Sequence, residues 1–115
     1  MKFKFEKNMR IVSDLIAYCH RMGSSDYHID MKLRKNVSVF MVSAPTPKLT
    51  DEDLADLEEV LNAPRQHEVE QNYWGLGGES ETNPELTLLG MMIDDARIDF
   101  NDGVLTIVAR RIEND

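Results

Sequence analysis

Residues 96–110 read ARIDFNDGVLTIVAR and carry the clearest structural signal in the chain. Apolar and polar side chains alternate on both sides of Asn101-Asp102-Gly103, and Asp-Gly between two alternating runs is typical of a tight β-hairpin. Strands joined by so short a turn run antiparallel. Residues 96–100 and 104–110 are therefore predicted to form the C-terminal pair of a β-sheet.

A second pair of strands is predicted in the first half of the chain. Residues 27–33 alternate between apolar and polar side chains, as expected for a half-buried strand. After a polar turn, residues 37–42 are apolar on both faces except at Ser38, which indicates a strand in the interior of the sheet. Pro45 and Pro47 lie beyond it, and proline ends a strand because it cannot donate to the ladder of hydrogen bonds.

Three helices are predicted around these strands. The first covers residues 8–22, where apolar side chains recur every three or four positions before a glycine. The second starts at Thr50, a capping residue, and continues to about Asn62. The third starts at Asn83-Pro84, an N-cap followed by proline at the first helical position. Their apolar stripes are Val12, Leu15, Ile16, Cys19 and Met22; Leu54, Leu57 and Leu61; and Leu86, Leu89, Met92 and Ile93.

Residues 2–6 alternate Lys-Phe-Lys-Phe-Glu, which predicts a short N-terminal strand with Phe3 and Phe5 on one face. Such a strand either closes the edge of its own sheet or pairs with a second copy of the chain, and both alternatives stay open.

Strand pairs separated by helices predict an α+β fold over residues 1–115. We expect one domain, a two-layer α/β sandwich with a mixed sheet and the helices on one face. A doubly wound parallel sheet needs a helix between every two strands, which this order does not provide. A chain of 115 residues also has room for only one hydrophobic core.

Charge and cysteine content argue against several classes of protein. The 13 Lys and Arg and 21 Asp and Glu give a formal net charge of -8, which repels nucleic-acid phosphates and anionic lipids. Cys19 is the only cysteine and lies on a helical apolar stripe, which predicts an inert core thiol and no disulfide within the chain. His20, His28 and His67 lack the spacing of metal ligands. No apolar stretch approaches the roughly 20 residues of a membrane span, so we expect a small, acidic, cytoplasmic domain.

The order of these elements, with their local sequences over about residues 9–110, resembles the ATP-binding domain of the GHKL superfamily. The likeness is strongest to the catalytic domains of histidine kinases and to the small anti-sigma-factor kinases. Their first helix carries an Asn/Glu-Leu-Leu-x-Asn-Ala motif whose second Asn helps to hold Mg²⁺, and residues 14–19, DLIAYC, match it here. The resemblance places Asp14 in a nucleotide site, while Tyr18 stands at the position of the metal-binding Asn. A phenol with a pKa of about 10 is a poor ligand for Mg²⁺.

Two further motifs of the family have counterparts in the chain. An Asp-x-Gly-x-Gly motif follows the central strand and reads the adenine amino group; it matches residues 43–47, SAPTP, with Ser43 in place of the Asp. A Gly-x-Gly-Leu-type loop, whose backbone N–H groups bind the phosphates, matches Gly75, Gly77 and Gly78. Three carboxylates beside a triphosphate are unfavourable unless a metal ion or basic residues offset them. Three acids do follow this loop here: Glu79, Glu81 and Glu85.

Other interpretations stay open for these residues. The three glycines can form a tight turn that binds nothing. Tyr73 and Trp74 can stack on a base or fill part of the core or an interface. Asp14, Tyr18 and Arg21 share one side of the first helix, which is either the wall of a site or a solvated face with an acid–Arg pair.

With these departures, the resemblance implies a regulatory or signalling module in which ATP binding is weakened or lost. The module would act through a protein partner, with a homodimer as one form of that partnership. On this hypothesis it has no catalytic residue, no metal and no resident cofactor. Two alternatives stay open: an active anti-sigma-type protein kinase that uses ATP and Mg²⁺, and a small-ligand binding module that reuses the nucleotide pocket.

Overall fold

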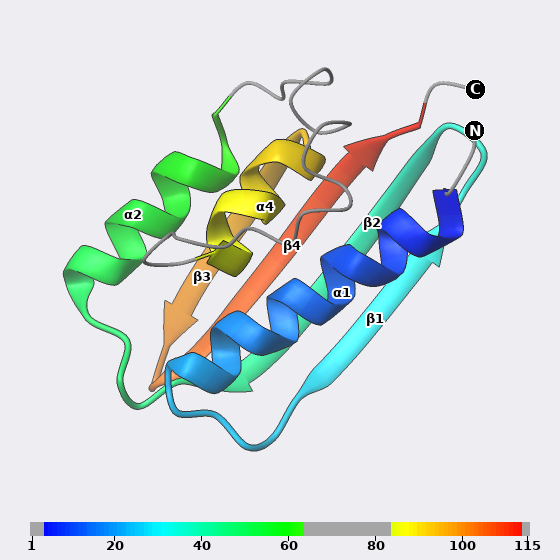
Figure 1. The fold of residues 1–115 in the computed structure, drawn as a ribbon. Coiled ribbons are helices and arrows are strands. Elements are labelled where there is room, and N and C mark those ends of the chain that lie inside the picture. Colours follow the sequence, from blue (N-terminus) through cyan, green and yellow to red (C-terminus); the bar gives the residue numbers. More distant parts are fainter. Residues whose placement is uncertain (1–3, 64–83, 114–115) are drawn as a thin grey trace.

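The computed structural model describes residues 4–63 and 84–113 of the chain. Figure 1 shows one layer of helices in front of one sheet. In chain order the elements are α1 (Lys4–Arg21), β1 (His28–Leu33), β2 (Val37–Pro45), α2 (Asp51–Leu61), α4 (Pro84–Met92), β3 (Asp95–Asn101) and β4 (Val104–Ile112). The α+β two-layer architecture and the position of the helices on one face are confirmed.

The sheet has the strand order β1-β2-β4-β3, and every neighbouring pair is antiparallel. The expectation of a mixed sheet is therefore wrong for the described residues. Strands β2 and β3 do run in the same direction, but β4 folds back from the hairpin and lies between them. The interior strand predicted at 37–42 is confirmed as β2, which continues to Pro45.

The short strand predicted at residues 2–6 is wrong over its described part, because Lys4–Glu6 form the first turn of α1. Alternation over five residues does not separate a strand from a helix, since Phe5 and Met9 also share one helical face. The Nζ of Lys4 donates to the carbonyl of Arg34 at 3.2 Å, which fixes the start of α1 above the turn between β1 and β2.

Local sequence explains where the elements begin and turn. Thr50 and Asp53 form a capping box, each side chain accepting a hydrogen bond from the other's backbone N–H, at 3.0 and 3.1 Å. Asp102 and Gly103 both have positive φ, 53° and 78°, as the tight turn between β3 and β4 requires. Gly23 ends α1 with a φ of 96°.

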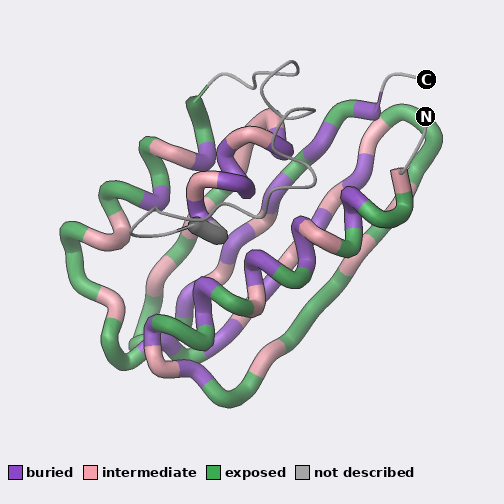
Figure 2. The backbone as a smooth tube through the Cα atoms, in the orientation of Figure 1, coloured by how far each residue is buried: buried purple, intermediate pink, exposed green. Residues whose placement is uncertain are grey.

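The core lies between the helices and one face of the sheet (Figure 2). Strand residues alternate between this face and the opposite one, so every second residue of β2 and β4 is buried. The helices contribute the stripes expected from the sequence. The fully buried apolar side chains include Ile11, Leu15, Cys19, Phe40, Val42, Leu57, Leu61, Leu89, Leu105 and Ile107.

Candidate functional site

One flank of α1 is polar and buried. Asp14 and Tyr18 lie one turn apart on α1, beside the apolar stripe, and they are 7% and 1% exposed. Lys7, two turns before Asp14 on the same flank, is 6% exposed. We call Lys7, Asp14 and Tyr18 the polar flank of α1. The structure thus brings together two of the residues predicted from the sequence, and a solvated face is wrong for both.

Asp14 is held by a neighbour on its own helix. The Nε of Arg10 lies 3.4 Å from one carboxylate oxygen of Asp14 and 3.3 Å from the other. Asp14 therefore pairs with Arg10, four positions earlier, whereas the acid–Arg pair considered from the sequence involved Arg21. Because the guanidinium already compensates this carboxylate, Asp14 is not presented as an open ligand for a second cation.

Lys7 is the member of this flank that sequence analysis missed. Lysine is rarely buried to this degree unless its ammonium has a partner. Its position, seven residues before Asp14, returns to nearly the same helical angle, and this spacing was the signal that could have found it. Together the flank offers an ammonium, a phenol and a carboxylate.

A second set of buried polar groups joins the sheet to the end of α4. The side chains of Arg111 and Glu113 are both 0% exposed, with Nε of Arg111 3.4 Å from Oε1 of Glu113. Ser38, paired with Arg111 across β2 and β4, donates to Oε2 of Glu113 at 2.8 Å. We call Ser38, Arg111 and Glu113 the buried ion cluster.

The buried ion cluster also caps a helix. Nη1 of Arg111 donates to the carbonyl of Met92, the last residue of α4, at 2.6 Å. A cation at the C-terminus of a helix satisfies a carbonyl that has no partner within the helix and matches the helix dipole. These contacts hold α4 against β4, so we assign the cluster a structural role.

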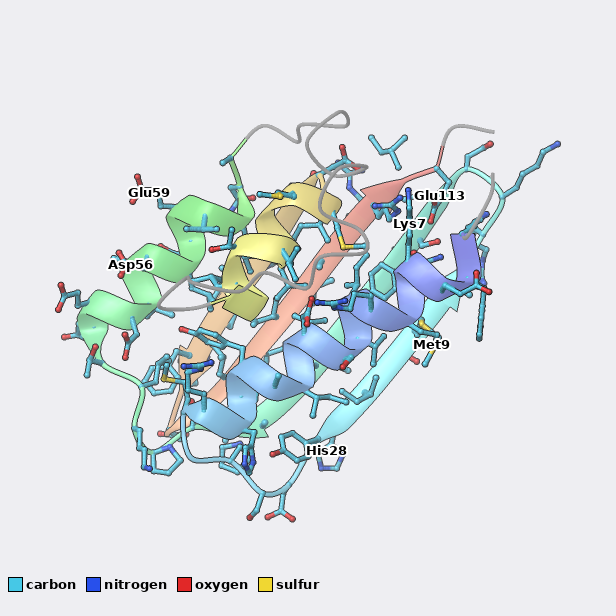
Figure 3. The ribbon with its side chains drawn as sticks, viewed as in Figure 1. Lys7, Met9, His28, Asp56, Glu59 and Glu113 are labelled. Atoms are coloured by element: carbon cyan, nitrogen blue, oxygen red, sulfur yellow. The ribbon has the colours of Figure 1, made fainter. Side chains whose placement is uncertain are left out.

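The polar flank of α1 and the buried ion cluster both reach the same end of the molecule. Figure 3 places Lys7 and Glu113 at the end where α1 begins and β4 finishes. Asn8, next to Lys7, is fully buried, and neither atom of its amide has a hydrogen-bond partner. A buried amide without hydrogen-bond partners is costly. Asn8 is therefore a polar site at this end of the molecule whose hydrogen bonds the described residues do not supply.

Ser43 is not part of this assembly. It lies on the face of the sheet away from the helices, where its hydroxyl is 3.2 Å from that of Thr106. Ala44, the next residue, points into the core and is fully buried. Because consecutive strand residues face opposite ways, Ser43 lies on the opposite side of the sheet from α1, which carries Asp14 and Tyr18. A methyl group occupies the helix-side position at the end of β2.

The remaining predicted residues fall into two groups. His20 and His28 are exposed, and Nδ1 of His20 is 3.2 Å from the hydroxyl of Tyr27. In residues 4–63 and 84–113, no group of three or more His, Cys, Asp or Glu side chains is placed to hold a metal ion. The other predicted residues lie outside the described residues: His67, Tyr73, Trp74, Gly75, Gly77, Gly78, Glu79 and Glu81.

The donor set on the polar flank does not fit a magnesium nucleotide. Tyr18 offers a buried phenol, and Asp14 is paired with Arg10. Mg²⁺ prefers carboxylate and carbonyl oxygens and retains several waters. The phenol is not such a ligand, and the Asp14 carboxylate already has Arg10 as a cationic partner.

Cys19 is the inert core thiol expected from the sequence. It is fully buried, and desolvation raises the pKa of its thiol to about 11. The thiolate, which is the reactive form, is therefore scarce at neutral pH.

Among the helices that the structure describes, none is long and apolar enough to cross a membrane. No protein-family model matches the chain, and a search of curated proteins finds no significant match.

Proposed function

We propose that this chain is a regulatory module with a fold like that of histidine-kinase ATP-binding domains, in which nucleotide binding is lost or strongly weakened and protein binding is the activity. The observation that carries the proposal is the burial of Tyr18, which is 1% exposed on the polar flank of α1. In the family that the sequence resembles, the corresponding side chain is a polar ligand open to metal and nucleotide.

The chemistry of the neighbouring positions supports the same conclusion. A base-reading side chain at the end of β2 would have to reach the helix side of the sheet, where Ala44 has only a methyl group. Asp14 is compensated by Arg10 within its own helix. Recognition of a purine amino group needs an acceptor that is otherwise left unpaired, and Ala44 supplies none.

The surface favours a protein partner over a phosphate-bearing ligand. The net charge is -8, and the solvent-facing side of α2 is acidic. Its exposed acids are Asp51, Glu52, Asp56, Glu58 and Glu59. Figure 3 shows Asp56 and Glu59 directed away from the sheet. Such a helix repels a triphosphate and complements a basic protein surface.

We expect Mg²⁺-ATP at millimolar concentration to leave the melting temperature unchanged within about 1 °C. A ligand at a hundred times its Kd would stabilise the folded state by about 2.7 kcal/mol. At about 4–8 °C per kcal/mol, this corresponds to a shift of roughly 10 °C or more for a domain of this size. The measurement is a thermal melt with ATP and ADP, each with and without Mg²⁺, followed by calorimetric titration.

The pattern of shifts separates the three candidate functions. A Mg²⁺-dependent shift of several degrees would contradict the proposal and support the active kinase. The variant Asp14→Asn would then be expected to abolish the shift. A shift with nucleotide that does not depend on Mg²⁺ would instead support a small-ligand module.

A further inference from the structure

The sheet has a second broad surface, formed by the side chains that point away from the helices. On the two central strands these are apolar in the middle, where Met41 pairs with Val108, and hydroxylic at Ser43 and Thr106. None of the helices in the described part of the chain lies on this side (Figure 1). We call it the outer face of the sheet. Its apolar members are Val37, Val39, Met41, Val104, Val108 and Ile112, of which Val104 and Ile112 are 37% and 41% exposed.

Charged residues lie beside this apolar band on both edge strands, and Arg110 of the central strand β4 lies within it, paired with Val39. The pairing register places them in rows across the sheet, β1 on one side and β3 on the other. One row reads Asp30, Met41, Val108, Arg97. The next reads Lys32, Val39, Arg110, Asp95, and the row on the other side reads His28, Ser43, Thr106, Asp99. In every row the two edge residues are complementary, acid against base or imidazole against acid.

This arrangement makes the outer face complementary to itself. A two-fold axis parallel to the strands, lying between two copies, sets β1 of one copy over β3 of the other and β2 over β4. Each row then faces the same row in reverse order. Asp30 meets the partner's Arg97, Lys32 meets the partner's Asp95, and His28 meets the partner's Asp99.

We propose that a second copy of this chain packs on the outer face of the sheet, forming a symmetric dimer with two stacked sheets and the helices outside. The interaction uses a surface distinct from the polar flank of α1 and does not depend on the proposed function. The apolar side chains of the central strands supply most of the buried area, and the charged residues of the edge strands fix the orientation.

The net charge of the surface favours self-association at this place. The outer face carries three basic residues, Lys32, Arg97 and Arg110, and three acids, Asp30, Asp95 and Asp99. It is thus neutral overall, whereas the chain as a whole carries -8. Two copies repel each other through most of their surfaces, and they repel least where the charges cancel.

The ion pairs within one copy do not prevent the charged residues of the edge strands from contacting a second copy. Asp95 accepts from Arg110 at 2.5 Å, and this hydrogen bond raises the pKa of the exposed Arg110 guanidinium above its ordinary value. The charge beside Val39 and Val108 is therefore balanced within the chain. Asp30 and Lys32 also contact each other, but both remain about half exposed. Exposed pairs of this kind hold their partners weakly, so the charges can be shared across an interface.

The size of the face sets the expected strength of the dimer. Four strands spaced about 4.8 Å apart, with six to nine residues rising about 3.3 Å each, cover roughly 500 Å² on each copy. The two copies together bury roughly 1,000 Å², at the lower limit of stable interfaces. Sheets packed in this way cross at about 30°, which displaces the edge strands by only a few ångströms, within the reach of Lys and Arg side chains. We expect a dissociation constant in the micromolar range.

Paired charge reversals test the interface and its orientation. Sedimentation velocity from about 1 µM to about 500 µM should show wild-type protein moving from the 13.2 kDa chain mass to twice that mass. Asp30→Lys sets two cations against each other at both symmetric contacts, and Arg97→Asp sets two acids against each other. Each variant alone should raise the dissociation constant of the dimer about tenfold or more. An equimolar mixture of the two should recover the wild-type mass, because each contact then joins opposite charges.

Two further variants complete the design. Asp56→Lys makes the same charge change as Asp30→Lys on the exposed face of α2, in the helix layer, and should leave the dimer intact. Val108→Asp places a charge in the apolar centre and should give a folded monomer, with circular dichroism and a cooperative melt as checks. A wild-type protein that stays at the chain mass over the whole range overturns the proposal. So does a dimer that is unchanged by Val108→Asp, or a mixture of the two charge variants that remains monomeric.

Discussion

At the scale of single residues, three positions decide what this fold can do: Tyr18, Ala44 and Arg111. Tyr18 on α1 and Ala44 at the end of β2 both face the core and are 1% and 0% exposed. Arg111 is equally buried, yet its guanidinium is satisfied by Glu113 and by the carbonyl of Met92. These contacts compensate the loss of water that burial of the Arg111 charge entails.

Cys19 gives a prediction on pH dependence. Its thiol pKa is about 11 in the folded protein, against 9.0 for an unperturbed thiol. Because the thiol pKa is higher in the folded than in the unfolded protein, the contribution of Cys19 to the free energy of unfolding is fully present below pH 9. This contribution is lost as the pH rises towards 11. A difference of about two pKa units corresponds to about 2–3 kcal/mol at the upper limit.

Urea unfolding of wild type and Cys19→Ala between pH 8 and about 11 measures this loss, since other groups titrate in both proteins alike. We expect Cys19→Ala to be the less stable protein at pH 8, because it leaves a small cavity, and to lose less stability than wild type as the pH rises. Two parallel pH profiles would contradict the assignment.

Strand periodicity determined how much of the site could be predicted at this scale. Asp14 and Tyr18 could be predicted to lie on one side of a helix because their spacing there is independent of tertiary structure. The face on which Ser43 lies could not be predicted, since an apolar run such as 37–42 does not reveal which residues face the helices. Arg111 could have been found, because it continues the inward series of Leu105, Ile107 and Ala109.

At the scale of elements, the packing of α2 against α4 depends on a glycine. A Cβ built on Gly90 would lie 2.9 Å from both Cγ1 and the carbonyl oxygen of Val60, closer than ordinary contacts of 3.4–4 Å. The absence of a side chain lets the two helices approach closely. The C-terminal end of α2 is also joined to the sheet, because the side chain of its C-cap residue Asn62 accepts a hydrogen bond from the N–H of Ala96 at 2.9 Å.

We therefore expect Gly90→Ala to destabilise the protein by about 1–3 kcal/mol, although alanine favours a helix over glycine by about 1 kcal/mol. The free energy of urea unfolding measures the change. Val60→Ala removes the clash with Cγ1 but not the clash with the carbonyl, so the double variant should recover only part of the loss. A Gly90→Ala protein at least as stable as wild type would show that α2 and α4 separate freely.

Elements were easier to predict than their ends and partners. The hairpin at Asn101-Asp102-Gly103 and the capped start of α2 carry local signals that no distant contact overrides. The N-terminal segment failed because two phenylalanines in five residues fit either period. The two strand pairs were predicted, but their union into one antiparallel sheet was not. The position of β4 between β2 and β3 depends on contacts between residues far apart in the sequence.

At the scale of the whole molecule, charge is distributed unevenly over two layers. The outer face of the sheet is balanced, whereas α2 carries acids from its first turn to its last turn and no basic residue in that last turn. Glu58 and Glu59 near the C-terminus of α2 oppose the helix dipole. Among the described residues, repulsion between like charges is therefore concentrated on α2, while the charges on the outer face of the sheet cancel.

This imbalance predicts a dependence of stability on salt. Raising the ionic strength from about 0.01 M to about 0.5 M shortens the range of charge repulsion from roughly 30 Å to a few ångströms. We expect the melting temperature to rise by several degrees, because self-repulsion among the acids of the folded chain is screened. Asp56→Lys with Glu59→Lys brings the net charge from -8 to -4 and should raise the melting temperature at low salt. The double variant should also respond less to added salt than wild type.

The measurement is a series of thermal melts at protein concentrations below the dissociation constant of the dimer, so that association does not contribute. Lys35→Arg, on the exposed turn between β1 and β2, changes no charge and serves as the matched control. Since Asp56 and Glu59 lie on the helix layer and Asp30 and Arg97 on the sheet layer, the two pairs of variants should act independently, the first on salt dependence and the second on dimer mass. A low-salt melting temperature that falls in Asp56→Lys/Glu59→Lys would mean that these acids stabilise the fold through contacts rather than oppose it through repulsion.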